Sequence, residues 1–124
     1  MDLDLDYVVL MENIEIINKD WLSSMASTKK EFLTKLFGVF LRDEPARVTK
    51  IREAFEAEHM DELKYLAHSL KGAAATMGAD RVREACLRLE YSARDGDKEL
   101  SKKNLLVLEE EMKLVYDFMS DFIH

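Results

Sequence analysis

The sequence has few of the residues that interrupt helices. One proline and four glycines occur among its 124 residues. Because proline and glycine mark most turns and helix ends, their scarcity leaves room for long helices. Little of the chain shows the alternation of apolar and polar residues that predicts a half-buried strand. The absence of these signals predicts an all-α protein.

Cysteine, long apolar runs and basic charge are also scarce. The single cysteine, Cys86, excludes an intrachain disulfide and is typical of a reducing compartment, which we expect to be the cytoplasm. No apolar run approaches the ~20 residues that a membrane span needs. The acidic start MDLDLDYVVL lacks the basic region of a secretory signal. A net charge of -7 argues against nucleic acid as a partner.

The remaining composition predicts one folded domain without a cofactor. Hydrophobic residues make up 48% of the chain and charged residues 35%, which is typical of a globular domain with one core. The three histidines and one cysteine show no metal-ligand spacing. No G-x-x-x-x-G-K-[ST] phosphate loop is present. The sequence also offers no candidate pair of nucleophile and base, which argues against an enzyme with its own active site.

Apolar residues recur at three- and four-residue steps along four segments, and this spacing predicts four helices. The expected helices span about 27–57, 61–77, 80–95 and 101–122. Their expected N-caps are Ser27 or Thr28 for the first helix, Asp61 for the second and Asp80 for the third. Pro45 is expected to kink or briefly break the first helix. Gly78 is expected to end the second helix.

Short connections between these helices predict an antiparallel up-down four-helix bundle, with one or two additional N-terminal helices. We expect a single domain over 1–124, with the bundle in 27–124 and a helical cap in 1–26. The cap is suggested by an apolar stripe formed by Tyr7, Leu10, Ile14, Ile17 and Trp21. The alternative is that Ile14, Ile17 and Trp21 extend an apolar docking patch.

The second predicted helix carries a histidine on its solvent side. On a helical wheel at about 100° per residue, His68 lies roughly 140° from the centre of the apolar face. Lys71 follows at i+3, within reach of an anion on the imidazole, and Gly72 at i+4 leaves the ring uncrowded. A glycine inside a helix costs about 1 kcal/mol relative to alanine. Access of a partner to His68 would explain why a glycine is kept at position 72. Two alternatives are that His68 is a surface histidine without function, and that Gly72 allows another helix to pack closely.

The run H-S-L-K-G from His68 to Gly72, followed by Gly78, resembles the signature of histidine-containing phosphotransfer (HPt) domains. FLTKLFGVFLRDEP is similar to the helix that precedes this signature, and CLRLEYSARDGD is similar to the helix that follows it. The resemblance covers about 27–122. It implies that His68 accepts a phosphoryl group from a receiver-domain aspartate or a sensor kinase and passes it to another receiver aspartate. It also implies a phosphocarrier that is not an enzyme, with no autokinase activity.

The resemblance further suggests residues that assist His68. Glu90 matches the position where the family often keeps a glutamine or glutamate that accepts a hydrogen bond from the ring. Glu90 and Arg94 lie one turn apart on a flank of the third helix that could border His68. Arg94 and Lys71 would then hold phosphate oxygens. The simpler alternative is a surface Glu90–Arg94 pair worth ~0.3–0.5 kcal/mol.

The partners implied by the resemblance are response-regulator receiver domains and a sensor or hybrid histidine kinase. Mg²⁺ is expected only in the receiver domain. Exposed positions expected to meet a partner are Lys64, Tyr65, Ser69 and Ala75. We expect a monomer, because one histidine in a compact bundle suffices for transfer, and no membrane or nucleic-acid contact.

Two alternatives to a stand-alone carrier remain at this point. One is a helical adaptor that keeps the HPt shape without phosphotransfer, although His68, Lys71 and Gly72 together argue against it. The other is the HPt segment of a larger chemotaxis-type kinase, although the start at Met1 and the predicted end near His124 favour a full chain. Elsewhere, Cys86 is expected in the core, and the run 109–111 of three glutamates is expected on a solvated helix face.

Overall fold

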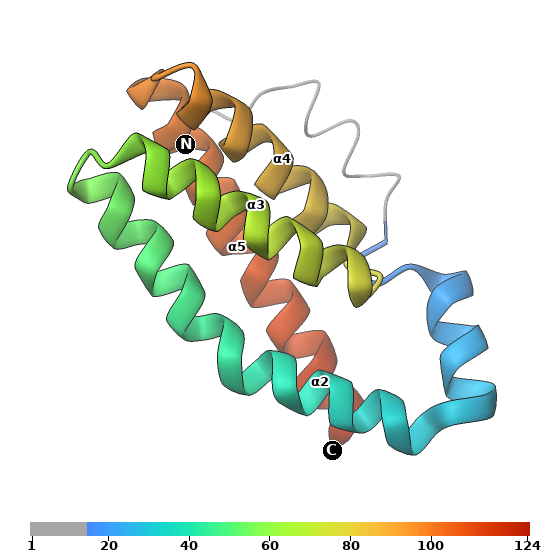
Figure 1. Cartoon of the computed structure of the whole chain (residues 1–124). Helices are drawn as coiled ribbons and strands as arrows, with labels where there is room; N and C mark the ends of the chain where they lie inside the picture. Colours follow the sequence, from blue (N-terminus) through green and yellow to red (C-terminus); the bar gives the residue numbers. More distant parts are fainter. Residues whose placement is uncertain (1–14) are drawn as a thin grey trace.

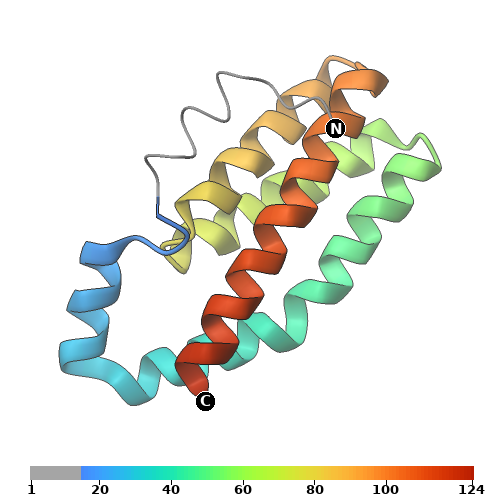
Figure 2. The same ribbon diagram turned by 180° about the vertical axis from the view of Figure 1, so that it is seen from behind.

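The computed structural model describes residues 15–124, which form a bundle of antiparallel helices. Its helices are α2 (Lys19–Glu56), α3 (Met60–Thr76), α4 (Asp80–Arg94) and α5 (Lys98–Ile123). Each helix packs against two neighbours around the bundle, and the two ribbon views show the resulting up-down arrangement (Figures 1 and 2). No strand is assigned within 15–124. The predicted all-α four-helix bundle is confirmed.

One core runs along the bundle and receives side chains from every helix. Phe37 of α2, Leu70 of α3, Leu89 of α4 and Leu108 of α5 are each fully buried. Each such side chain contributes about 1.5–3 kcal/mol when it leaves water. Cys86 is buried among them, as predicted. Within residues 15–124, no helix is both long enough and apolar enough to cross a bilayer.

Helix α2 begins earlier than the sequence suggested. It starts at Lys19, and Asn18 is its N-cap, with a side-chain oxygen that accepts a hydrogen bond of 2.9 Å from the Trp21 N–H. The predicted start at Ser27 or Thr28 is therefore wrong. The predicted boundary between a cap in 1–26 and a bundle in 27–124 falls inside this continuous helix.

Pro45 does not break α2. The helix is continuous on both sides of it, and Pro45 lies on an exposed face. The missing N–H leaves the Leu41 carbonyl, one turn earlier, without its usual donor, so α2 has one hydrogen bond fewer without ending there. The sharp bend of α2 in Figure 1 lies well before Pro45, in the blue-to-cyan part of the ribbon. Of the two outcomes predicted for Pro45, the break is therefore wrong, whereas the single long helix that continues past Pro45 to Glu56 agrees with the prediction.

The start of α2 is fastened to the turn between α3 and α4. The Asn18 N–H donates to the Gly78 carbonyl at 2.7 Å, and its side-chain amide donates to Asp80 at 3.1 Å. The Trp21 indole lies directly over Gly78, and Ile17, which precedes Asn18, is buried in the core. Ile17 and Trp21 therefore cover this end of the core, in agreement with the capping interpretation.

Not every part of that apolar stripe can be placed. Ile17 precedes α2 in a non-helical bend, so this position is not in a helix. Tyr7, Leu10 and Ile14 lie outside the described residues. The N-terminal helices predicted there stay a prediction.

The other helix ends follow local sequence closely. Gly78 and Gly96 stop α3 and α4 with φ of 67° and 70°, the left-handed conformation that glycine adopts at helix ends. The predicted N-caps Asp61 and Asp80 are wrong, because His59 and Ala79 hold those positions. Asp61 lies two residues after its cap and Asp80 one residue after its cap, in the first turns of α3 and α4. There their carboxylates still favour the helix dipole. Helix α5 starts three residues before the predicted Ser101, because the Asp97 side chain caps it.

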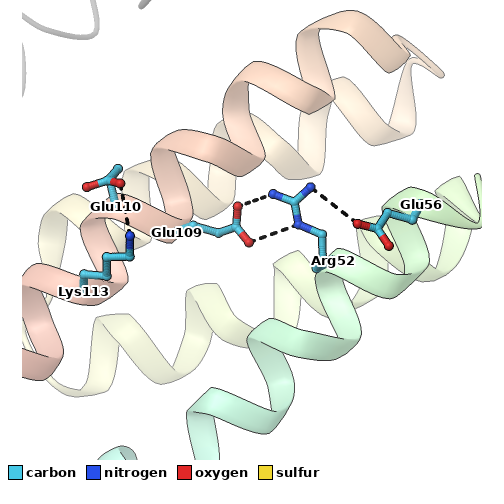
Figure 3. A network of polar contacts seen from close by, with 5 residues as sticks. All are labelled: Arg52, Glu56, Glu109, Glu110 and Lys113. Atoms are coloured by element: carbon cyan, nitrogen blue, oxygen red, sulfur yellow. Dashed lines mark hydrogen bonds and ion pairs between the residues drawn. The ribbon is translucent and has the colours of Figure 1, made fainter. Parts of the chain in front are cut away.

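Two glutamates of the 109–111 run bind arginines on other helices. Arg52 of α2 donates to Glu109 with both Nε and Nη2, and Figure 3 shows this pairing between the two helices. Glu111 is buried and pairs with Arg81 of α4 at 2.8 Å. Only Glu110 is exposed, so the predicted solvated face is wrong for the other two. Their partners lie 57 and 30 residues away, which local patterning does not reveal.

Candidate functional site

Helix α3 presents His68 to solvent, as predicted. The His68 side chain is 63% exposed, whereas Ala67 and Leu70 on the same helix are fully buried. This difference follows from the helical repeat, which turns consecutive residues by about 100°. Helix α3 therefore keeps its apolar face in the core and leaves the imidazole at the surface, beside α4.

Glu90 of α4 lies in contact with His68 of α3. The Nδ1 atom of His68 lies 2.9 Å from Oε2 of Glu90. An ionised carboxylate only accepts hydrogen bonds, so Nδ1 is the donor and carries the hydrogen. In the neutral ring the free lone pair then belongs to Nε2, the nitrogen that Glu90 does not contact. This contact selects one tautomer and makes Nε2 the nucleophilic atom.

Lys71 holds the second oxygen of the same carboxylate. Its Nζ atom donates to Oε1 of Glu90 at 2.7 Å. Burial acts to raise the pKa of Glu90, but the hydrogen bonds from Lys71 and His68 outweigh it, and the pKa of Glu90 lies below its usual value. Glu90 is therefore ionised at neutral pH and acts on His68 as an anion.

Gly72 lies one turn after His68 on the exposed side of α3. A Cβ built on Gly72 meets nothing within 4 Å among the described residues. The alternative that Gly72 lets one of the described helices pack closely is therefore contradicted. The position is open, and a larger side chain there would extend into the space beside the imidazole.

Arg94 is not brought to His68. Its guanidinium carbon lies 4.8 Å from the centre of the Tyr91 ring, and its Nε is 3.5 Å from Asp95. The Glu90–Arg94 surface pair is not formed either, because the Glu90 oxygens are occupied by Lys71 and His68. The position of Arg94 therefore gives no support to the phosphate-binding role predicted for it.

The ion pair between Lys71 and Glu90 was missed by sequence reasoning, which directed Lys71 towards phosphate alone. The two residues are 19 positions apart and on different helices. Their contact depends on the register of α3 against α4. The spacing of residues within either helix does not reveal this register, so the sequence held no local signal for the pair.

The surroundings of His68 are open rather than enclosed. Tyr65, one turn before it, is 69% exposed, Ala75 is exposed, and Lys64 and Ser69 are half-buried. Two hollows of about 430 and 230 Å³ lie elsewhere and include neither His68 nor Glu90. Within 15–124, no three His, Cys, Asp or Glu side chains are grouped to hold a metal. An open surface of this kind suits a reaction partner that is itself a protein.

Comparisons with known proteins agree with this arrangement. Residues 35–117 match the sequence model of the Hpt domain. Histidine-containing phosphotransfer protein B from Pseudomonas aeruginosa PAO1 superposes with a TM-score of 0.79 at 25% identity, over 86% of this chain and 92% of that one. A putative histidine-containing phosphotransfer protein from rice has a TM-score of 0.74 at 16% identity, over 95% of this chain and 90% of that one, which supports the fold alone.

A curated relative is considerably longer than this chain. Multistep phosphorelay regulator 1 from Schizosaccharomyces pombe is 25% identical over 97 residues, which are 73% of this chain. The chain spans 33% of the length of that relative.

Proposed function

The chain belongs to the Hpt domain family, the histidine phosphotransfer proteins of phosphorelays, and we propose that His68 is the residue that carries its phosphoryl group. The observation that supports this most is the contact between Nδ1 of His68 and the Glu90 carboxylate at 2.9 Å. It leaves the Nε2 lone pair free on a ring that is 63% exposed. Because Glu90 orients the ring through Nδ1 while Nε2 stays accessible, His68 is suited to direct phosphoryl transfer from a protein partner.

In the proposed first step, Nε2 of His68 attacks the phosphorus of a receiver acyl phosphate in line. The P–N bond forms as the P–O bond breaks, and the bonding electron pair leaves with the receiver carboxylate. The imidazole gains positive charge, which the nearby Glu90 anion stabilises through the Nδ1–H. Lys71 is positioned to turn from Glu90 towards the new phosphoryl oxygens. The receiver would bring the Mg²⁺ that its own acidic pocket binds.

Members of this family are phosphocarriers rather than kinases. We propose that this chain follows them, with no autokinase activity. Its proposed partners are response-regulator receiver domains and a sensor or hybrid histidine kinase, met as a monomer in the cytoplasm. The chain spans about a third of the length of a curated relative. A second candidate function is therefore that of an HPt segment within a larger signalling protein.

The test is transfer of label from a purified, phosphorylated receiver domain. We expect acid-labile, base-stable label on the wild-type protein and none on His68→Gln. The matched control is His59→Gln, because His59 is also exposed and precedes the same helix. Gly72→Leu should accept label more slowly at unchanged helicity, because its side chain extends into the open space beside the ring.

Label that persists in His68→Gln would assign the carrier role to another residue. An unlabelled but folded wild-type protein, tried with several receivers, would favour the adaptor alternative.

A further inference from the structure

Glu90 holds the imidazole with a full charge, although a neutral side chain of the same shape would supply the same hydrogen bond. The carbonyl oxygen of a glutamine could accept from Nδ1 at the 2.9 Å that separates His68 and Glu90. What an amide lacks is the negative charge beside the ring. The inference below rests on the proposed function and concerns what that charge does once His68 is phosphorylated.

A phosphorylated imidazole has two protonation states with different reactivity. When Nδ1 keeps its hydrogen, the ring is cationic, and the P–N bond can break with its electron pair returning to Nε2 to leave a neutral imidazole. When Nδ1 has lost its hydrogen, the same cleavage would have to expel an imidazolate anion, a far poorer leaving group. The protonated form is therefore the one that transfers its phosphoryl group readily.

We propose that the charge of Glu90 keeps the phosphorylated His68 ring protonated at Nδ1 through neutral and mildly alkaline pH, and so keeps its phosphoryl group transferable. The proton then stays on Nδ1 in both half-reactions. Accepting the phosphoryl group forms the P–N bond, donating it to a receiver aspartate breaks that bond, and no general base is needed in either direction. Glu90 thus acts as the counter-ion of the phosphoimidazolium.

The other charged side chains on α2, α3 and α4 also affect how readily the phosphorylated ring keeps its proton. Lys71 shares the carboxylate through Oε1, and its cation opposes the effect of Glu90 on the ring. Lys64 lies one turn before His68 on α3, and Arg94 is engaged with Tyr91 and Asp95 on α4. Helix α2, which also packs against α3, carries the Glu44–Arg47 ion pair, whose opposite charges largely cancel at a distance. Glu90 is the anion in direct contact with the ring, so its removal should dominate.

The test compares Glu90→Gln with the wild type after both are phosphorylated with phosphoramidate, a small reagent that needs no partner. Phosphorus and nitrogen NMR then follow the phosphorylated ring across pH and give the midpoint at which Nδ1 loses its hydrogen. Loss of an opposite charge in contact should lower this midpoint by about 1–3 pH units. Transfer to a receiver should slow about tenfold or more at pH values between the two midpoints, and should be nearly unchanged well below both.

Two further variants keep the result interpretable. Glu110→Gln removes the same charge from an exposed site on α5 and should leave the midpoint unchanged. Lys71→Gln removes the opposing cation and should raise the midpoint, which provides a second test if Glu90→Gln is poorly phosphorylated.

Equal midpoints for Glu90→Gln and the wild type would overturn the inference, as would a downward shift in Lys71→Gln. Either result would leave His68 as the carrier, because receiver-derived label tests that role separately. Absence of receiver-derived label at His68 would instead refute the proposed function.

Discussion

Two glycines with the same backbone conformation separate a backbone effect from a packing effect in this fold. Gly78 and Gly96 have φ of 67° and 70°. Among residues 15–124, a Cβ on Gly96 meets nothing within 4 Å, whereas a Cβ on Gly78 would lie 2.9 Å from Cδ2 and Cε3 of Trp21. Alanine therefore carries the left-handed strain at both positions, but only at Gly78 must the indole also move.

The magnitudes follow from these two terms. A left-handed backbone costs an L-residue about 1–2 kcal/mol, so Gly96→Ala should lower the free energy of unfolding by about that amount. Gly78→Ala adds the displacement of Trp21, which stacks on Phe37 with ring centroids 6.3 Å apart. Forcing extra volume into packed surroundings costs about 1–3 kcal/mol, which brings the expected loss at Gly78 to about 2–5 kcal/mol.

The assay is urea unfolding followed by far-UV circular dichroism. Trp21 is the single tryptophan of the chain, so its fluorescence reports independently on this contact. Trp21→Ala, combined with each glycine variant, completes two double-mutant cycles. We expect a coupling energy of about 1–3 kcal/mol with Gly78→Ala and none with Gly96→Ala. Equal losses for the two glycine variants, or equal couplings, would refute the argument that Trp21 packs rigidly on Gly78.

Four further predictions concern single positions. Gly72→Ala should raise the free energy of unfolding by about 0.5–1 kcal/mol in urea, because the open site accepts a Cβ; a loss would contradict this. Arg52→Met should lower it by about 0.5–1 kcal/mol, less in high salt, by removing the partly exposed pair with Glu109; equal losses at all salt concentrations would argue against an electrostatic effect. Burial raises the pKa of Tyr116 to about 12, so its contribution to stability should be present below about pH 10 and lost as pH rises towards 12; native tyrosines that all ionise together near pH 10 in an ultraviolet titration would contradict this. Burial also raises the pKa of the Cys86 thiol, so a thiol reagent should react at the rate of unfolding, and rapid labelling of the native protein would contradict its burial.

The predictable helix ends are those that nearby residues determine. Gly78 and Gly96 stop α3 and α4 where predicted, because only glycine adopts positive φ there without strain. The start of α2 was missed because Asn18 combines a local cap with contacts to Gly78 and Asp80, 60 or more residues along the chain. An asparagine before an apolar stripe only weakly indicates a helix start until those distant partners are known.

The site was predictable to the extent that a helical wheel determines it. The exposure of His68 and the placement of Glu90 on the flank of α4 that faces α3 both follow from periodicity, and the structure brings the two into contact. The wheel does not distinguish Lys71 bound to Glu90 from Lys71 directed at solvent. Nor does it show that Arg94 turns to Tyr91 and Asp95. The partners of Lys71 and Arg94 depend on the register between helices and on competition between neighbouring side chains.

Gly72 is the residue that most directly tests whether a partner must approach His68. A helix-interior glycine lowers stability by about 0.5–1 kcal/mol relative to alanine. The described part of the chain places nothing near its Cβ, so packing does not require glycine at this position. Positive φ does not require it either, because Gly72 lies inside the regular turns of α3. We therefore propose that access to His68 is the reason for the glycine. Gly72→Ala and Gly72→Leu should separate stability from access: the first should stabilise the fold, and the second should slow phosphoryl transfer without unfolding the protein.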